Sequence, residues 1–205
     1  MNNPRLREAV ATKGVSVMEN QLSNDSCGEL LAPDDCVLVI IDVQERLLPV
    51  MSGREELLES VVTLVKFAKV IDMPVVVTEQ EKLGATVKEV ADEIKDLAPI
   101  SKIEFDACKR KGFLERIEDL GRNTVIITGI ESHVCVTQTV LSLLPDFTVH
   151  VVSDAVSSRT MENVEVALQR MRHSGAVISS TEMVIFELLE KAGTPDFKEA
   201  LKLVK

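Results

Sequence analysis

The sequence contains no tryptophan and no tyrosine, and its six phenylalanines supply all of its aromatic residues, 3% of 205. It also lacks any run of about 18 apolar residues, the length that a membrane-crossing helix requires. Its first residues lack the apolar core of a secretory signal as well. We therefore expect a soluble, intracellular protein with no membrane partner. A cytoplasmic location is favoured, and a mitochondrial one is the less favoured alternative.

Other absences narrow the chemistry. The formal net charge is −10 and no block of basic residues occurs, which argues against nucleic acid as a partner and favours a small-molecule substrate. No GxGxxG or P-loop motif follows a predicted strand, so no cofactor is indicated. The cysteines show no CxxC spacing, which disfavours a zinc knuckle and a disulfide framework. They are Cys27, Cys36, Cys108 and Cys135.

The pattern of apolar residues predicts an α/β fold. The length and the 45% apolar content favour one domain over residues 34–205, preceded by a polar N-terminal extension, residues 1–33. Short apolar runs alternate with helical faces, which is typical of a three-layer α-β-α architecture with a mostly parallel central sheet. The predicted strands are 36–42, 74–80, 123–129, 147–154 and 176–180, and the clearest predicted helices are 53–72, 181–193, capped by Thr181, and 195–205.

Three ionisable side chains lie where predicted strands end, the edge at which open parallel sheets bind ligands. Asp42 ends the first apolar run, Lys102 lies in a short extended segment, and Cys135 follows the turn after residues 123–129. Each has an ordinary alternative explanation: a turn-forming acid, a surface cation and a small apolar filler. Together they form a coherent set.

A thiol in the first turn of a helix can have a lowered pKa, and a nearby ammonium lowers it further. We therefore expect a reactive Cys135 assisted by Lys102. A carboxylate such as Asp42 could take the thiol proton and pass it to a leaving amine. The backbone N–H groups of Glu131 and Cys135 could stabilise an oxyanion beside the sulfur.

These residues occur in "VIIDVQ", "SKIEF", "TGIESHVCVTQTV" and "VSDAVSSRT". In that order, from about Val37 to the C-terminus, they resemble the isochorismatase-like cysteine hydrolases, and most of all the isochorismatase domain-containing subgroup. The resemblance implies that Asp42 is the general base, Lys102 the thiolate-stabilising cation and Cys135 the nucleophile. It also implies a cis peptide bond between Ile130 and Glu131.

The departures from the family are informative too. Nicotinamidases hold a metal with histidines near the end of the second strand, but "VVVTEQEKLGATVKEV" contains none, so a metal-independent enzyme is expected. Because isochorismatases often lack the cysteine, Cys135 favours hydrolysis of an amide or another C–N or acyl bond through a thioester. The resemblance places Gln44, Gln80 and Phe105 beside the triad, where they line a substrate pocket or serve ordinary packing.

Two hypotheses remain open. In the first, the protein is a cysteine hydrolase that uses the Asp42, Lys102 and Cys135 triad. In the second, it is an interaction or regulatory module that keeps the fold and has little hydrolase activity. Either form is expected to be a homo-oligomer.

Overall fold

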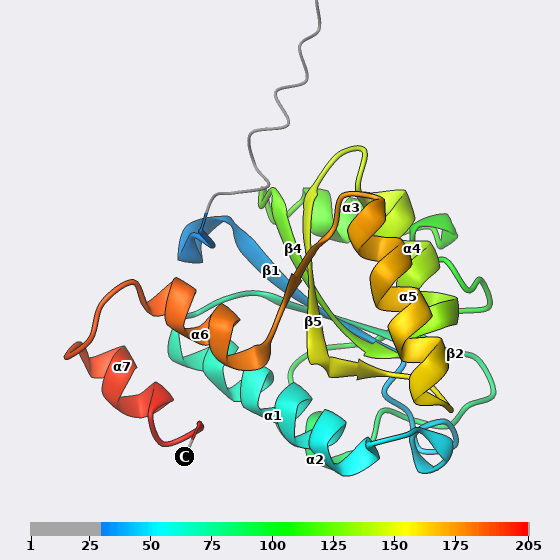
Figure 1. Cartoon of the computed structure of the whole chain (residues 1–205), viewed down its shortest axis with the longest axis horizontal. Coiled ribbons are helices and arrows are strands. Elements are labelled where there is room, and N and C mark those ends of the chain that lie inside the picture. Colours follow the sequence, from blue (N-terminus) through cyan, green and yellow to red (C-terminus); the bar gives the residue numbers. More distant parts are fainter. Residues whose placement is uncertain (1–29, 205) are drawn as a thin grey trace, which may run out of the picture.

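The computed structural model describes residues 30–204 (Figure 1). The extension predicted for residues 1–33 therefore falls largely outside the described residues, as does Cys27. The strands are β1 Cys36–Ile41, β2 Val75–Gln80, β3 Ile100–Lys102, β4 Thr124–Ile130, β5 Thr148–Ser157 and β6 Val177–Ser179. The α-helices are α1 Arg54–Val70, α2 Lys88–Ala91, α3 Phe113–Glu118, α4 Thr137–Leu143, α5 Met161–His173, α6 Thr181–Leu189 and α7 Pro195–Ala200.

The six strands form one parallel sheet in the order β3-β2-β1-β4-β5-β6. The strand order changes direction between β1 and β4. In sheets of this kind, the crevice outside the carboxyl ends at such a point is the usual ligand site. Asp42 follows β1 at this position, and the segment that carries Cys135 follows β4.

The central strand β1 shows why the sheet is covered on both faces. All six of its side chains are buried. Leu38 and Ile40 belong to a core formed with α1, α6 and α7, whereas Val37, Val39 and Ile41 belong to a second core formed with α3, α4 and α5. Successive strand residues point to opposite faces. The three-layer α-β-α prediction is therefore confirmed, and the two groups of helices are visible on either side of the sheet in Figure 1.

The predicted element ends differ from the structure mainly at helices. The helix predicted over 181–193 ends at Leu189, and the one predicted over 195–205 ends at Ala200. The cap of α6 is Ser180 rather than Thr181, because Ser180 keeps an extended backbone and its hydroxyl accepts from the N–H of Met183. Among residues 30–204, no helix has the length and apolar character needed to cross a membrane.

Candidate active site

A buried ion pair joins the ends of two strands. Asp42, directly after β1, has a left-handed backbone with a φ of 53°, a conformation that aspartate tolerates better than most residues. Lys102, the last residue of β3, reaches across the end of β2 and places Nζ 2.6 Å from the Asp42 Oδ2 atom. Asp42 is 0% exposed and Lys102 is 1% exposed. Two charges buried this completely require close pairing and full hydrogen bonding.

Neighbouring groups form hydrogen bonds with both the Lys102 ammonium and the Asp42 carboxylate. The Lys102 ammonium also donates to Gln80 Oε1 at 2.8 Å and to the Glu104 carbonyl at 3.2 Å. Its three protons therefore have three acceptors. The Thr78 hydroxyl donates to the second carboxylate oxygen, Asp42 Oδ1, at 2.7 Å. Each oxygen of Asp42 thus has a defined partner, which fixes the plane of the carboxylate.

Cys135 lies in a π-helical turn, Ser132–Val136, between β4 and α4, and is 6% exposed. Burial, and to a lesser extent the charge of Asp42, raise the pKa of its thiol, and Lys102 opposes them; the net pKa is about 12. Because both Asp42 and Lys102 act on this pKa, the thiol lies beside the ion pair, and the three groups form one cluster. The expectation of a lowered Cys135 pKa is wrong for this state of the site.

The reason lies in the net charge that the sulfur experiences. Lys102 is paired with Asp42, and the pair as a whole is neutral, so it offers little stabilisation to a second anion. Helix α4, whose positive end was expected to help, begins only at Thr137, two residues beyond Cys135. Desolvation therefore dominates. At neutral pH the Cys135 thiol is therefore protonated.

The backbone beside Cys135 carries an unused donor. The Ile130–Glu131 peptide bond is cis, as the family resemblance implied. The Glu131 carbonyl accepts from the N–H groups of Val134 and Val136, at 3.0 and 3.2 Å. The N–H of Glu131, by contrast, has no hydrogen-bond acceptor among residues 30–204. That N–H is available to an oxygen bound at this position.

Comparison with known proteins places this geometry in a family. Residues 36–183 match the model of the isochorismatase domain. The chain belongs to the isochorismatase domain family. The match covers every strand and the whole Asp42, Lys102 and Cys135 cluster, and it identifies the architecture as an isochorismatase-family hydrolase fold.

Several relatives share most of the chain. The secreted isochorismatase effector Isc1 of Phytophthora sojae is 42% identical over 184 residues, which cover 85% of this chain and 87% of that protein. Isochorismatase domain-containing protein 2A of mouse is 36% identical over 186 residues, covering 88% and 87%.

Solved structures show the same fold. The MAR1 ribonuclease structure from Caenorhabditis elegans superposes with a TM-score of 0.80 at 32% identity, covering 86% of this chain and 92% of that one. The YcaC gene product of Escherichia coli, described as an octameric hydrolase of unknown specificity, shares the fold with a TM-score of 0.77 at 23% identity, covering 85% and 87%.

Two of the predicted pocket residues are used to hold this isochorismatase-family site together. The Gln44 side chain donates to the carbonyls of Gln80 and Gly84, at 3.0 and 2.7 Å, and accepts from the Gln80 N–H at 2.8 Å. The Gln80 amide in turn contacts Lys102 and donates to the Ile103 carbonyl at 2.8 Å. Phe105 is 55% exposed. Contact of any of them with a substrate stays a prediction.

The structure adds residues that sequence reasoning missed. Thr78 is the one that contacts the Asp42 carboxylate directly. It lies inside a predicted strand of mostly apolar residues, so the sequence gave no sign of a polar role. Arg159 pairs with Glu131 at 3.0 Å, next to the π-helical turn. Asp154 caps the N–H of Thr181.

Two further side chains of the second-strand region and the π-helical turn have structural partners. Both carboxylate contacts of Glu79 go to Thr86, one to its N–H and one to its hydroxyl. The His133 ring contacts the Ser158 hydroxyl at 2.9 Å. Within residues 30–204 no cluster of three His, Cys, Asp or Glu side chains has the arrangement of a metal site.

Proposed function

We propose that the protein is a metal-independent cysteine hydrolase that cleaves a small amide, or another C–N or acyl substrate, through a thioester on Cys135. The observation that carries the proposal is the buried Asp42–Lys102 pair, at 2.6 Å, beside a thiol that both residues influence. A structural role alone gives no reason to bury three ionisable groups together at the ligand-binding edge of the sheet.

The raised thiol pKa is compatible with nucleophilic catalysis when the proton moves to Asp42 during attack. Before the transfer, Lys102 pairs with the carboxylate. After it, Asp42 is neutral and Lys102 pairs with the thiolate, so the ammonium keeps one anionic partner throughout. The pair thereby stabilises the charge that develops on sulfur in the transition state.

The reaction then proceeds in two halves. The Cys135 sulfur bonds to the substrate carbonyl carbon, and the oxyanion accepts hydrogen bonds from the N–H groups of Glu131 and Cys135. Asp42 returns the proton to the leaving nitrogen as the C–N bond breaks, which leaves a thioester. A water molecule next loses a proton to Asp42 and attacks the thioester. The acid is released, and the sulfur recovers the proton.

Burial limits the substrate. Because Asp42 and Lys102 are enclosed and Cys135 is 6% exposed, only a small acyl group can reach the sulfur without rearrangement of the surrounding loops. This favours a compact substrate over a polymer. Since the relative from Caenorhabditis elegans is named a ribonuclease, RNA is the principal competing substrate class.

We also propose assembly into a homo-oligomer. Segments that follow the carboxyl ends of the strands expose large apolar side chains, an arrangement that a second copy of the chain could cover. They are Val50, Ile103, Phe105 and Met161. The octameric state named for the Escherichia coli relative supports the same expectation.

The decisive experiment is to trap the acyl intermediate. The protein, in buffer that contains EDTA, is mixed with 4-nitrophenyl acetate, quenched with acid and digested for mass spectrometry. We expect an acetyl group on the Cys135 peptide and a burst of nitrophenol equal to the enzyme concentration. Both signals should be lost in Cys135→Ala. They should persist in Cys108→Ser, the matched control, because that thiol is also mostly buried and lies outside the cluster.

The interaction-module hypothesis makes the opposite prediction. If Cys135 gains acetyl groups no faster than Cys108, the cluster does not activate the thiol and the hydrolase proposal fails. A burst that requires added metal after EDTA treatment would also contradict the proposed mechanism.

A further inference from the structure

A cavity of about 320 Å³ lies at the edge of the sheet, away from the Cys135 cluster. Its wall is formed by the first half of β2, the loop before β3 and helix α3. The lining residues include Val75, Val76, Ile100 and Arg116. The volume is at the lower end of the roughly 300–1,000 Å³ typical of small-molecule sites.

The cavity exists because β3 is much shorter than β2. The first residue of β3, Ile100, pairs with Thr78, so β3 leaves the first part of β2 uncovered. The carbonyls of Pro74 and Thr78 accept from β1, and strand residues alternate in direction, so the N–H and C=O of Val75 point to the uncovered edge. Within the described part of the chain, no strand residue pairs with Val75 on that side.

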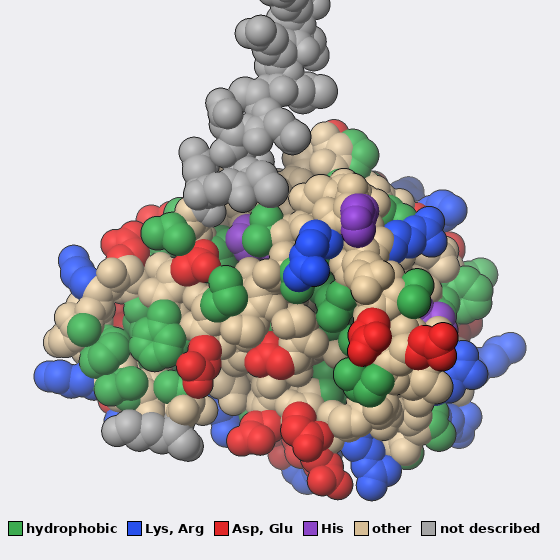
Figure 2. Space-filling model, in the orientation of Figure 1, with side chains coloured by type: hydrophobic (Ala, Val, Ile, Leu, Met, Phe, Trp, Pro, Cys, Tyr) green, Lys and Arg blue, Asp and Glu red, His purple; other side chains and the backbone are tan. Residues whose placement is uncertain are grey.

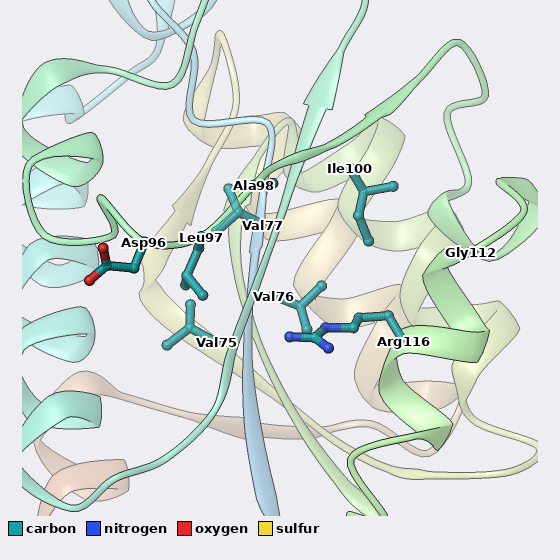
Figure 3. A pocket seen from close by; sticks show the side chains of 9 residues that line it. All are labelled: Val75, Val76, Val77, Asp96, Leu97, Ala98, Ile100, Gly112 and Arg116. Carbon is teal, nitrogen blue, oxygen red and sulfur yellow. The ribbon is translucent and has the colours of Figure 1, made fainter.

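Arg116 supplies an uncompensated cation at this edge. It extends from α3 toward β2, and its guanidinium lies beside the Val76 side chain (Figure 3). Asp96 also lines the cavity, but its carboxylate points away from Arg116 on the other side of β2 (Figure 3). Among residues 30–204, no carboxylate lies within ion-pair distance of Arg116, and its side chain has no hydrogen-bond acceptor.

From this combination we infer that the cavity is a second binding site, for a small carboxylate with a branched aliphatic body. The side chains of Val76 and Ile100, which lie on the Arg116 side of β2, would hold the aliphatic part (Figure 3). The planar guanidinium of Arg116 presents a fork of donors that matches a carboxylate in geometry and charge. The free N–H of Val75 offers another donor at the same edge.

Isovalerate is the probe that tests this site, with isovaleramide as its neutral counterpart of the same shape. Each is titrated into the full-length protein while the backbone amide signals are followed by two-dimensional NMR. Isovalerate should shift the signals of Val75, Val76 and Ile100 in a saturable manner. Isovaleramide should bind at least about tenfold more weakly than isovalerate, because it cannot form the charge-assisted pair.

Three variants separate the site from general charge effects. Arg116→Gln should weaken isovalerate binding at least about tenfold. Arg110→Gln makes the same charge change on an exposed residue outside the lining and should bind as the unmodified protein does. Ala98→Leu should reduce binding by filling the cavity while Arg116 stays in place.

The inference is overturned if isovalerate gives no saturable shifts, or if its shifts arise elsewhere in the protein. Equal binding of isovaleramide would overturn it too, as would equal binding of isovalerate by Arg116→Gln. Because none of these readouts depends on Cys135, failure here leaves the proposed hydrolase function untouched.

Discussion

Asp42 and Lys102 have opposite effects on the Cys135 thiol. Asp42 raises its pKa and Lys102 lowers it, with burial as the dominant contribution. A pKa of about 12 means that the thiolate fraction grows about tenfold for each pH unit across the accessible range. The rate of Cys135 alkylation by iodoacetamide should therefore rise from about pH 6 to about pH 9.5 without levelling. An ordinary thiol, with a pKa of about 8.5, would begin to level in that range.

Substitutions at the pair should move this profile in opposite directions. Asp42→Asn removes the negative charge and leaves Lys102 free to stabilise the thiolate, so alkylation should accelerate at a given pH even though hydrolysis is lost. Lys102→Met should slow alkylation because the stabilising cation is gone. Peptide mass spectrometry after timed alkylation measures Cys135 alone. A profile that is the same in the unmodified protein and both variants would show that the three groups are not coupled.

At the scale of elements, the sequence predicted the strands of the sheet more reliably than it predicted the contacts that hold the Asp42–Lys102 pair in place. The five apolar runs predicted five of the six strands within a few residues, because fully buried parallel strands need continuous apolar sequence. β3 is short and mixed, and it was recognised only as an extended segment that contains Lys102. Strand ends carried Asp42, Lys102 and Cys135 together because parallel strands all end at one edge.

What the sequence could not indicate are contacts that depend on register. Thr78 meets Asp42 because β2 is aligned with β1, and Gln44 clamps residues 80 and 84 because the chain turns sharply after β1. The raised thiol pKa arises in the same way. It depends on the closure of the Asp42–Lys102 pair and on burial, neither of which follows from spacing along the chain.

Gly129 provides a test of how strand packing supports the site. It pairs with Ile41, and its φ is 116°. A Cβ atom at Gly129 would lie 2.0 Å from the Ile41 carbonyl oxygen, one residue before Asp42. Gly129→Ala should therefore force β4 away from β1, lower the free energy of unfolding by about 3 kcal/mol or more, and abolish acetylation of Cys135.

The matched control is Gly121→Ala, which also changes a glycine of positive φ, here 63°, but has no atom within 4 Å of the added Cβ. Gly121→Ala should lower the free energy of unfolding by only about 1 kcal/mol, which is the cost of placing alanine in a left-handed backbone conformation, and should leave Cys135 reactive. Urea denaturation, monitored by circular dichroism, measures the stability of both variants. Similar losses of stability in the two variants would mean that the close approach to Ile41 does not matter.

At the scale of the whole molecule, charge separates the two substrate classes. The chain has 23 Lys and Arg against 33 Asp and Glu. On the face shown in Figure 2, basic side chains are scattered among acidic and apolar ones, without a continuous basic surface. Affinity for RNA depends mainly on cations that replace the counterions of phosphates. A compact acyl substrate makes no such demand.

We therefore expect no saturable binding of a single-stranded RNA at concentrations up to about 100 µM in physiological salt, within the range where basic proteins bind nucleic acid nonspecifically. Fluorescence anisotropy of a labelled oligonucleotide measures binding, and gel electrophoresis of the same RNA measures cleavage. Cleavage that persists in Cys135→Ala would come from a contaminating nuclease. RNA cleavage that is lost in Cys135→Ala and weakens as the salt concentration rises would instead assign Cys135 to phosphodiester chemistry. The salt dependence is diagnostic because the binding of RNA releases counterions, whereas the hydrolysis of a small acyl substrate at a buried sulfur does not.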